Sequence, residues 1–187
     1  MKKLLMVIPL VFLLCFTFGC QQGEEVVKEV PAEEKLRVGT FDSRAIAAAY
    51  GRSGELKQYI DSMKEKHKKA KEEGDDKLAE ELEAIGVSTQ QLLHQQGFST
   101  ASVADILEKV KAELPKIAED AGVDIIMSKW EVMYRNPSVE IVDVTSHLVK
   151  LFNPDDSALK LIEELLEQAP MPLLDLLIEI RKEQKEK

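Results

Sequence analysis

The chain has few of the residues on which metal sites and disulfides depend. Of its 187 residues only two are cysteines, Cys15 and Cys20, and both lie near the N-terminus. Its three histidines, His67, His94 and His147, have no second histidine or cysteine at the spacing that a zinc site requires. We therefore expect no metal ion and no cofactor, and a stability that comes from packing and assembly rather than from disulfides.

Motifs that signal catalysis are missing as well. No glycine-rich stretch is followed by the lysine and the serine or threonine of a phosphate-binding loop, and no serine stands in a G-x-S-x-G turn. The acidic pairs Asp75 with Asp76 and Asp155 with Asp156 fit no calcium-binding loop, and positions at helix starts account for both. The sequence thus predicts a protein that is not an enzyme.

Basic charge is in short supply. Lysine and arginine number 25 against 34 aspartates and glutamates, which gives a formal net charge of −9 at pH 7. A chain with this acidic balance does not attract the phosphates of DNA or RNA, so we expect no nucleic-acid partner. The basic run at 64–71 is diluted by acidic neighbours and is typical of the solvated face of a helix.

The N-terminus predicts export and a lipid anchor. Residues 1–19 combine two lysines with an apolar run at 4–18 that is too short to span a bilayer comfortably. The junction of Gly19 and Cys20 resembles the lipobox of bacterial lipoproteins, which implies cleavage before Cys20 and acylation of this cysteine. An uncleaved anchor and ordinary signal cleavage are the alternatives. Cleavage takes the net charge from −9 to −11, because the basic count falls to 23 while the acidic count stays at 34.

Residues 20–35 predict a flexible, acidic tether behind the acylated cysteine. Because two or more acyl chains give stable anchoring, we expect the protein to be held at a membrane surface in the periplasm. Gln21, rather than an aspartate, follows Cys20. Resemblance to the enterobacterial sorting rule therefore favours the outer membrane over the inner one.

The strand signal is confined to three short runs. Residues 36–42 read as one strand, and 123–128 and 132–134 read as two strands that flank a turn at 129–131. We interpret the last two as a hairpin that pairs with the first run in a small antiparallel sheet, followed by a helix that ends near Phe152. With helices filling the long interval between the strand regions, the predicted fold class is α+β.

The region 53–121 predicts a long helical arm that protrudes from this β body. Two runs of apolar positions step by four and three residues, which is typical of helices that pack along a narrow seam. We interpret them as an antiparallel helical hairpin with its tip within 74–98, where shorter helices flank Gly86. Pro115 predicts a kink near 111–113. The outward seam holds Leu56, Ile60 and Met63, and the return seam holds Val103, Leu107, Val110 and Leu114.

Residues 153–187 predict a C-terminal helical extension. The stretch 153–157 has good capping residues, and leucines and isoleucines give the following helix an apolar face. Pro170 and Pro172 separate it from a second run, 173–180, in which six of eight residues are apolar. The favoured interpretation of this run is a packed terminal helix, and the alternative is a segment that binds a partner or covers part of the protein itself.

The order of these parts resembles the Skp/OmpH family of periplasmic chaperones. The stretches that carry the resemblance are LRVGTFDSRAI at 36–46, VDIIMS at 123–128, VMYRN at 132–136 and DVTSHLV at 143–149. The resemblance covers residues 36–152 and implies a homotrimer whose arms enclose unfolded outer-membrane proteins without using ATP. The acidic charge, the lipid anchor, the shorter arm and the extension after Phe152 depart from the soluble, basic type of that family.

These observations predict a lipid-anchored holdase chaperone, and two sets of residues follow from that. The arm seams named above are the expected client-binding residues, and the expected centre of the oligomer consists of Val38, Phe41, Ile125 and Val132. A body this small buries little apolar area by itself, which favours self-association on physical grounds. The alternative is a structural envelope lipoprotein that uses the arm as a spacer or scaffold for one partner.

Overall fold

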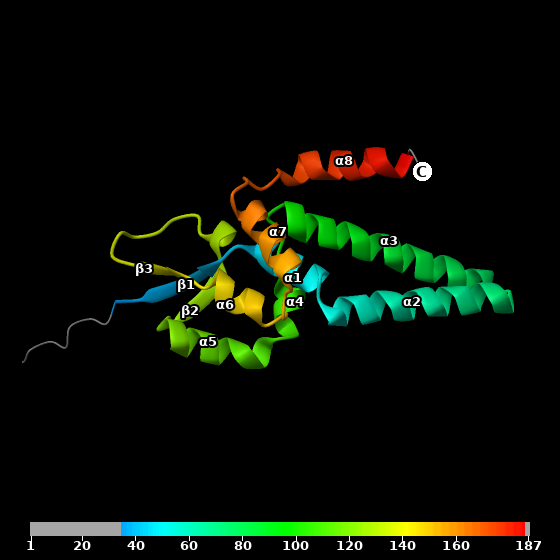
Figure 1. Cartoon of the computed structure of the whole chain (residues 1–187). Coiled ribbons are helices and arrows are strands. Elements are labelled where there is room, and N and C mark those ends of the chain that lie inside the picture. The colour runs from blue at the N-terminus through cyan, green and yellow to red at the C-terminus, as the bar shows by residue number, and fades with distance from the viewer. Residues whose placement is uncertain (1–34, 186–187) are drawn as a thin grey trace, which may run out of the picture. The chain divides into compact units, whose positions relative to one another are not determined.

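The computed structural model describes residues 35–185, in which helices surround a small sheet (Figure 1). This confirms the predicted α+β class at that level. The predicted signal sequence, Cys20 and nearly all of the predicted tether lie outside the described residues. No helix within 35–185 is both long and apolar enough to cross a membrane.

The sheet has three strands and is entirely parallel, so the predicted antiparallel hairpin is wrong. β1 (Arg37–Phe41) lies in the centre, with β2 (Ile125–Ser128) on one side and β3 (Glu140–Asp143) on the other. Val38 of β1 lies opposite both Ile125 and Ile141. Before β2 and again before β3, the chain therefore returns to the end of the sheet at which β1 begins.

The turn after β2 explains the difference. A tight hairpin needs glycine or asparagine at positive φ, and the sequence at η2 (Lys129–Glu131) offers neither. The chain instead forms a 3-10 turn, in which the Ser128 hydroxyl accepts a hydrogen bond from the backbone N–H of Trp130 at 3.3 Å. Residues 132–139 then return along the sheet as an irregular segment, with Met133 and Tyr134 exposed. The predicted strand at 132–134, including Val132, is part of that segment.

Helix α1 (Ser43–Gly51) forms the centre of the hydrophobic core. Asp42 caps it, and its run of alanines allows the neighbouring helices to approach closely, so that Ala45 and Ala49 are fully buried. Elements from both halves of the chain pack around it, among them α6 (Thr145–Lys150). The Tyr50 ring meets the Phe152 ring edge to face at 5.9 Å between centroids, which closes the core after α6.

The helical hairpin consists of α2 (Gly54–Glu73) and α3 (Asp76–Phe98), which run side by side in Figure 1. Gly74 ends α2 in the left-handed conformation at φ 73°, and the Asp75 carboxylate caps α3 by accepting a hydrogen bond from the backbone N–H of Leu78. The tip is therefore at 74–75. α3 runs through Gly86 as one helix, which replaces the two shorter helices that the sequence predicted.

The predicted return seam does not belong to the hairpin. Residues 103–121 form α4 (Ala104–Glu108), η1 (Lys111–Glu113) and α5 (Leu114–Ala121), and the side chains of Val103, Ile106 and Ile117 are buried in the core. Pro115 lies in the first turn of α5, directly after the 3-10 turn, where its missing N–H leaves no helical hydrogen bond unmade. The interruption near 111–113 is as predicted.

Two helices follow the core. α7 (Asp156–Leu166) is capped by Asp155 and packs on α1 through the buried side chains of Ala158 and Ile162. α8 (Leu173–Lys185) comes after the Pro170 to Pro172 linker and lies along α3. The region predicted as a C-terminal helical extension thus contains two helices within the described residues.

Candidate functional site

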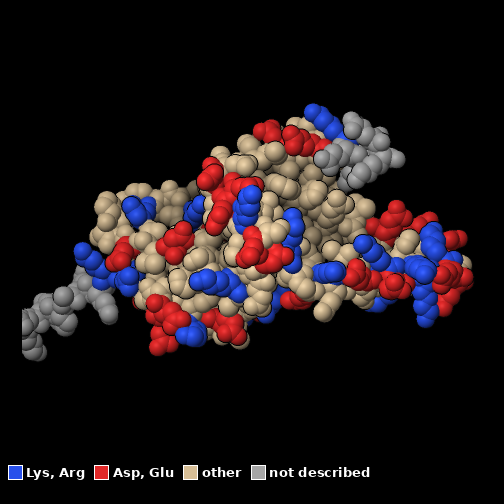
Figure 2. Space-filling model, viewed as in Figure 1, with Lys and Arg blue, Asp and Glu red and all other residues tan. Residues whose placement is uncertain are grey.

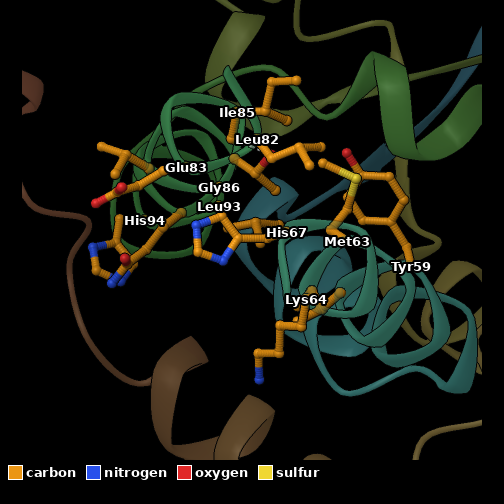
Figure 3. A pocket seen from close by; sticks show the side chains of 14 residues that line it. Tyr59, Met63, Lys64, His67, Leu82, Glu83, Ile85, Gly86, Leu93 and His94 are labelled. Carbon is orange, nitrogen blue, oxygen red and sulfur yellow. Dashed lines mark hydrogen bonds between the residues drawn. The ribbon is translucent and has the colours of Figure 1, made fainter. Parts of the chain in front are cut away.

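A hollow of about 650 Å³ opens between the two helices of the hairpin (Figure 3). In that view Met63 and His67 of α2 lie toward Leu82 and Leu93 of α3, whereas Lys64 points away from α3. We name this hollow the hairpin groove. Its walls are mainly apolar, and they consist of Tyr59, Ile60, Met63, Lys64 and His67 from α2 and Leu82, Glu83, Ile85, Gly86, Val87, Thr89, Gln90, Leu93 and His94 from α3.

The size of the side chains explains why the groove exists. Near the tip, Ala70 and Ala79 are almost fully buried, because small side chains let the two helices approach closely. Closer to the body the facing residues are larger, and only residues of α2 and α3 line the groove. Tyr59, Ile85 and Val87 therefore remain 44%, 44% and 45% exposed. Such a partly open apolar surface is suited to a polypeptide ligand.

The C-terminal half of α3 carries no charge. Residues 84–98 contain no aspartate, glutamate, lysine or arginine, although these types make up 32% of the chain. The charged residues of the hairpin crowd its tip instead, while uncharged surface extends over α3 toward the body (Figure 2). On α3 the half-exposed residues Leu78, Ile85 and Leu92 recur every seven residues. The absence of charge at 84–98 marks the site in the sequence, whereas the spacing of the apolar residues does not reveal it.

Two histidines lie in the hairpin groove, one from each helix. His67 and His94 both line it, and the Nε2 atom of His67 is buried with no hydrogen-bond partner among the described residues. The ring of His94 meets that of Phe98 edge to face at 5.7 Å. Within 35–185 no group of three or more histidine, cysteine, aspartate or glutamate residues is placed to hold a metal ion.

Of the predicted client-binding residues, only two lie in the groove. Ile60 and Met63 line it, whereas Leu56 is buried at the base of α2. The remaining four come from the segment that the structure assigns to the body, so they face the core and not the groove. Val103 is buried there, and Leu107, Val110 and Leu114 are partly buried against it.

The residues predicted for the oligomer centre are divided in the same way. Val38 and Phe41 are buried within the single chain. Val132 is half-buried in the segment after η2. Ile125, by contrast, is 46% exposed on β2, an edge strand of the sheet. Only Ile125 of this set offers a sizeable apolar surface to another chain.

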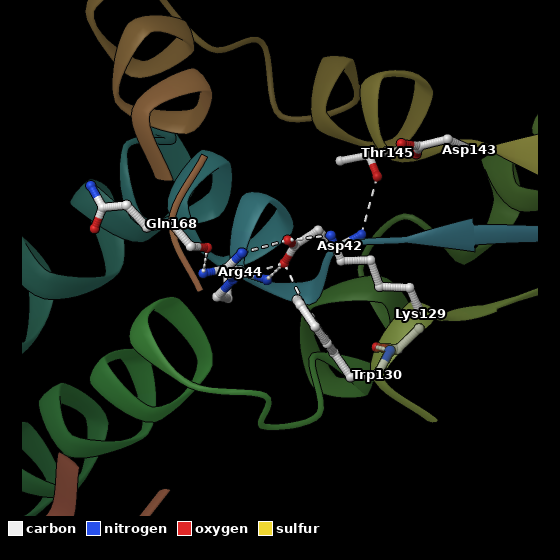
Figure 4. Close-up of polar contacts among 8 residues, drawn as sticks. Asp42, Arg44, Lys129, Trp130, Asp143, Thr145 and Gln168 are labelled. Carbon is white, nitrogen blue, oxygen red and sulfur yellow. Dashed lines mark hydrogen bonds and ion pairs between the residues drawn. The ribbon is translucent and has the colours of Figure 1, made fainter. Parts of the chain in front are cut away.

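A second cluster of chemistry-bearing groups lies at the carboxyl ends of the strands (Figure 4), where parallel sheets commonly bind ligands. The Asp42 carboxylate accepts hydrogen bonds from Arg44, from Lys129 Nζ at 2.9 Å and from the indole N–H of Trp130 at 3.2 Å. Its backbone N–H donates to Thr145 Oγ1 at 3.1 Å. Both carboxylate oxygens are thus occupied by protein groups, and we assign the cluster a structural role.

The charges in this cluster also determine the ionisation of Asp42. Burial by itself raises the pKa of the carboxyl group, but the hydrogen bonds from Arg44 and Lys129 outweigh burial and hold the pKa below its usual value. The Arg44 guanidinium also donates to the backbone oxygen of Gln168 at 2.9 Å. The cluster therefore connects the segment that directly follows α7 to the end of β1.

Comparisons with protein-family models, with curated proteins and with solved structures found no match to this chain. The resemblance to the Skp/OmpH chaperones therefore remains a prediction from the sequence. The hairpin groove and the charge-free half of α3 are the structural features on which a function can be argued.

Proposed function

We propose that this protein is a lipid-anchored periplasmic holdase, which binds apolar segments of unfolded outer-membrane proteins without ATP. The observation that carries the proposal is the hairpin groove, a partly open apolar surface lined by residues of α2 and α3. Its neighbour, the charge-free stretch 84–98, extends the same surface toward the body. The sequence resemblance supports the same function independently of the groove.

The proposed mechanism is reversible burial. A half-exposed side chain such as Ile85 gains about 1 kcal/mol when a client covers it, at roughly 25 cal/mol per Å² of apolar area. Several such contacts along α2 and α3 together hold an extended segment, and the loss of any single contact lowers the binding free energy only slightly. Because the client stays disordered, little ordering entropy opposes binding. Release therefore requires neither covalent chemistry nor nucleotide hydrolysis.

Attachment and assembly belong to the same proposal. Acylated Cys20 holds the domain at a membrane, with the outer membrane favoured, and residues 20–35 give it reach. A homotrimer brings several hairpin grooves together around one client, so weak contacts act jointly. The exposed Ile125 on the edge strand β2 supports contact between chains at the sheet.

The test replaces two half-exposed residues of the groove, Ile85→Lys and Val87→Lys, in the chain 20–187 carrying Cys20→Ser. The readout is light scattering from urea-diluted outer-membrane barrels at increasing protein concentration. Because each substitution removes about 1 kcal/mol of client contact, we expect half-protection to need roughly thirty-fold more of the double variant.

The matched control is Leu159→Lys with Leu166→Lys on α7, whose side chains are 39% and 40% exposed and lie outside the groove. These changes add the same charge at positions of similar exposure, so protection should stay at the wild-type level. Equal protection by the groove variant and the wild type, with unchanged circular dichroism, would show that the groove does not hold clients.

The second candidate function is a scaffold for one folded partner. The specific observation in its favour is the stripe of Leu78, Ile85 and Leu92, because apolar residues at heptad spacing fit one partner helix. Client range separates the two functions. A holdase protects several unrelated unfolded barrels, whereas a scaffold protects none of them and captures a single folded protein.

A further inference from the structure

Helix α8 is held to α3 by a small contact. Its side chains Leu176 and Ile180, one helical turn apart, are 4% and 8% exposed. Just before α8, the backbone N–H of Met171 donates to the backbone oxygen of Phe98 at 2.9 Å. An element with so few buried apolar residues opens at low free energy compared with the core.

The element before α8 is fixed much more firmly. α7 packs on the central helix α1, and the Arg44 guanidinium hydrogen-bonds to the backbone oxygen of Gln168 at the end of α7. Pro170 and Pro172 then prevent a continuous helix between α7 and α8. Motion of α8 therefore leaves the anchor at Gln168 and the core unchanged.

α8 carries more apolar surface than it buries. Beside the two side chains that face α3, four further leucine and isoleucine residues remain exposed, the largest fraction being 69% at Leu174. Three of these four line a hollow between α8 and α3, so α8 does not fill its seat on α3. The exposed set is Leu173, Leu174, Leu177 and Ile178.

α8 packs on the charge-free stretch of α3, beside the hairpin groove. A hollow of about 490 Å³ between α8 and α3 is lined on the α3 side by Gln91, which lies in the charge-free stretch 84–98 and next to Gln90 of the hairpin groove. Figure 1 shows α8 extending along α3. The α3 surface is thus already occupied, in this chain, by an apolar helix.

We propose that α8 is a built-in competitor of clients: it covers part of the client-binding face of α3 and is displaced when a client binds. The proposal rests on the proposed holdase function. The ligand class follows from α8 itself, which seats two large aliphatic side chains four residues apart; a client segment of the same kind replaces it. Displacement also exposes Leu176 and Ile180.

Two matched pairs of substitutions test this. Leu176→Glu with Ile180→Glu removes the seat on α3, and Leu159→Glu with Leu166→Glu adds the same charge on α7, outside the hollow between α8 and α3. If the docked state is populated at about 90%, undocking tightens binding of a small urea-unfolded outer-membrane barrel about ten-fold. We expect no such gain from the second pair. Equal affinity of the first pair and the wild type would overturn the proposal.

A cross-link gives a readout that does not depend on client protection. The chain 20–187 with Cys20→Ser has no other cysteine, so Gln91→Cys with Lys182→Cys places two unique thiols in the hollow between α3 and α8. A short bis-maleimide should join them, and the joined protein, which cannot undock, should bind the barrel at least ten-fold more weakly than the unjoined one. Added barrel should lower the yield of the cross-link. A yield that the barrel leaves unchanged counts against displacement.

A peptide of residues 173–185 distinguishes a failure of the proposed competition by α8 from a failure of the proposed holdase function. Added to the chain truncated after residue 172, it should bind and compete with the barrel, with circular dichroism confirming that the truncated chain is folded. Competition supports the proposal. Peptide that binds without competing overturns it while leaving the holdase intact. If the wild type and every variant protect no barrel, the holdase function fails, and this proposal fails with it.

Discussion

Asp42 and Arg44 form an ion pair of 2.8 Å between Oδ2 and Nη2, in which the two side chains are 1% and 3% exposed. Removal of the carboxylate leaves the guanidinium buried beside Trp130 without its counter-charge. We expect Asp42→Asn to lower the free energy of unfolding by about 3–5 kcal/mol, as measured by urea titration with circular dichroism. Asp120→Asn breaks an exposed pair with Lys116 and serves as the control that should change nothing measurable. A similar loss in both variants would contradict the structural role.

The pH dependence of stability follows from the same carboxylate. The folded-state pKa of Asp42 lies below the usual value of 3.8, so the charged form stabilises the fold above that pH. The difference in unfolding free energy between the wild type and Asp42→Asn should be constant near neutral pH. It should shrink as the pH falls through the folded pKa, because the protonated carboxyl loses its ion pairs. A difference that grows on acidification would exclude a lowered pKa.

Local signals predicted the local structure well. The run 36–42 contains β1, the capping residues at 153–157 contain the start of α7, and Pro115 marks the interruption before α5. Each of these features depends on residues near one another in the sequence, such as the Asp155 carboxylate that caps α7. Ile60 and Met63, which the spacing predicts as client-binding residues of the arm seam, line the hairpin groove.

Long-range pairing was the part that the sequence could not determine. Residues 103–121 have the spacing of a seam, but a helix buried against the body has the same pattern as one packed on α2. The choice depended on Gly74, which turns the chain early and makes α3 the partner of α2. Strand direction was likewise undetermined, because alternation specifies a face of the sheet and gives no information on parallel or antiparallel pairing.

Gly39, in the centre of the parallel sheet, should not tolerate a side chain. A Cβ atom there would lie 3.0 Å from Val123 Cγ2 and 3.3 Å from Val144 Cγ1. We expect Gly39→Ala to destabilise the fold by about 1–3 kcal/mol in thermal and urea unfolding. Gly97→Ala in α3 is the contrasting variant, since nothing lies within 4 Å and alanine favours helix. A stabilising effect at both positions would refute the tight packing around β1.

Lipid attachment is predicted to depend on a single atom, the sulfur of Cys20. Cys20→Ser should abolish incorporation of labelled fatty acid, and the mature protein should leave the membrane fraction or accumulate as the precursor. Cys15→Ser, within the apolar run that cleavage removes, is the matched control and should label normally. Label that persists in Cys20→Ser would show that the anchor lies elsewhere.

Assembly at the sheet is the prediction for which Ile125 provides the sharpest test. β2 is an edge strand, and within 35–185 no further strand pairs with its outer side. Ile125 is 46% exposed there, so a lysine at this position is tolerated by the single chain but is costly inside an interface between chains. We expect Ile125→Lys to lower the mass in light scattering from that of a trimer to that of a monomer, with circular dichroism and melting unchanged.

Met133→Lys introduces the same charge at a residue that is 91% exposed and should leave the mass as it is. A trimer that survives Ile125→Lys would place the subunit contact away from β2, and a wild-type monomer would remove the shared cage and leave each groove to act alone.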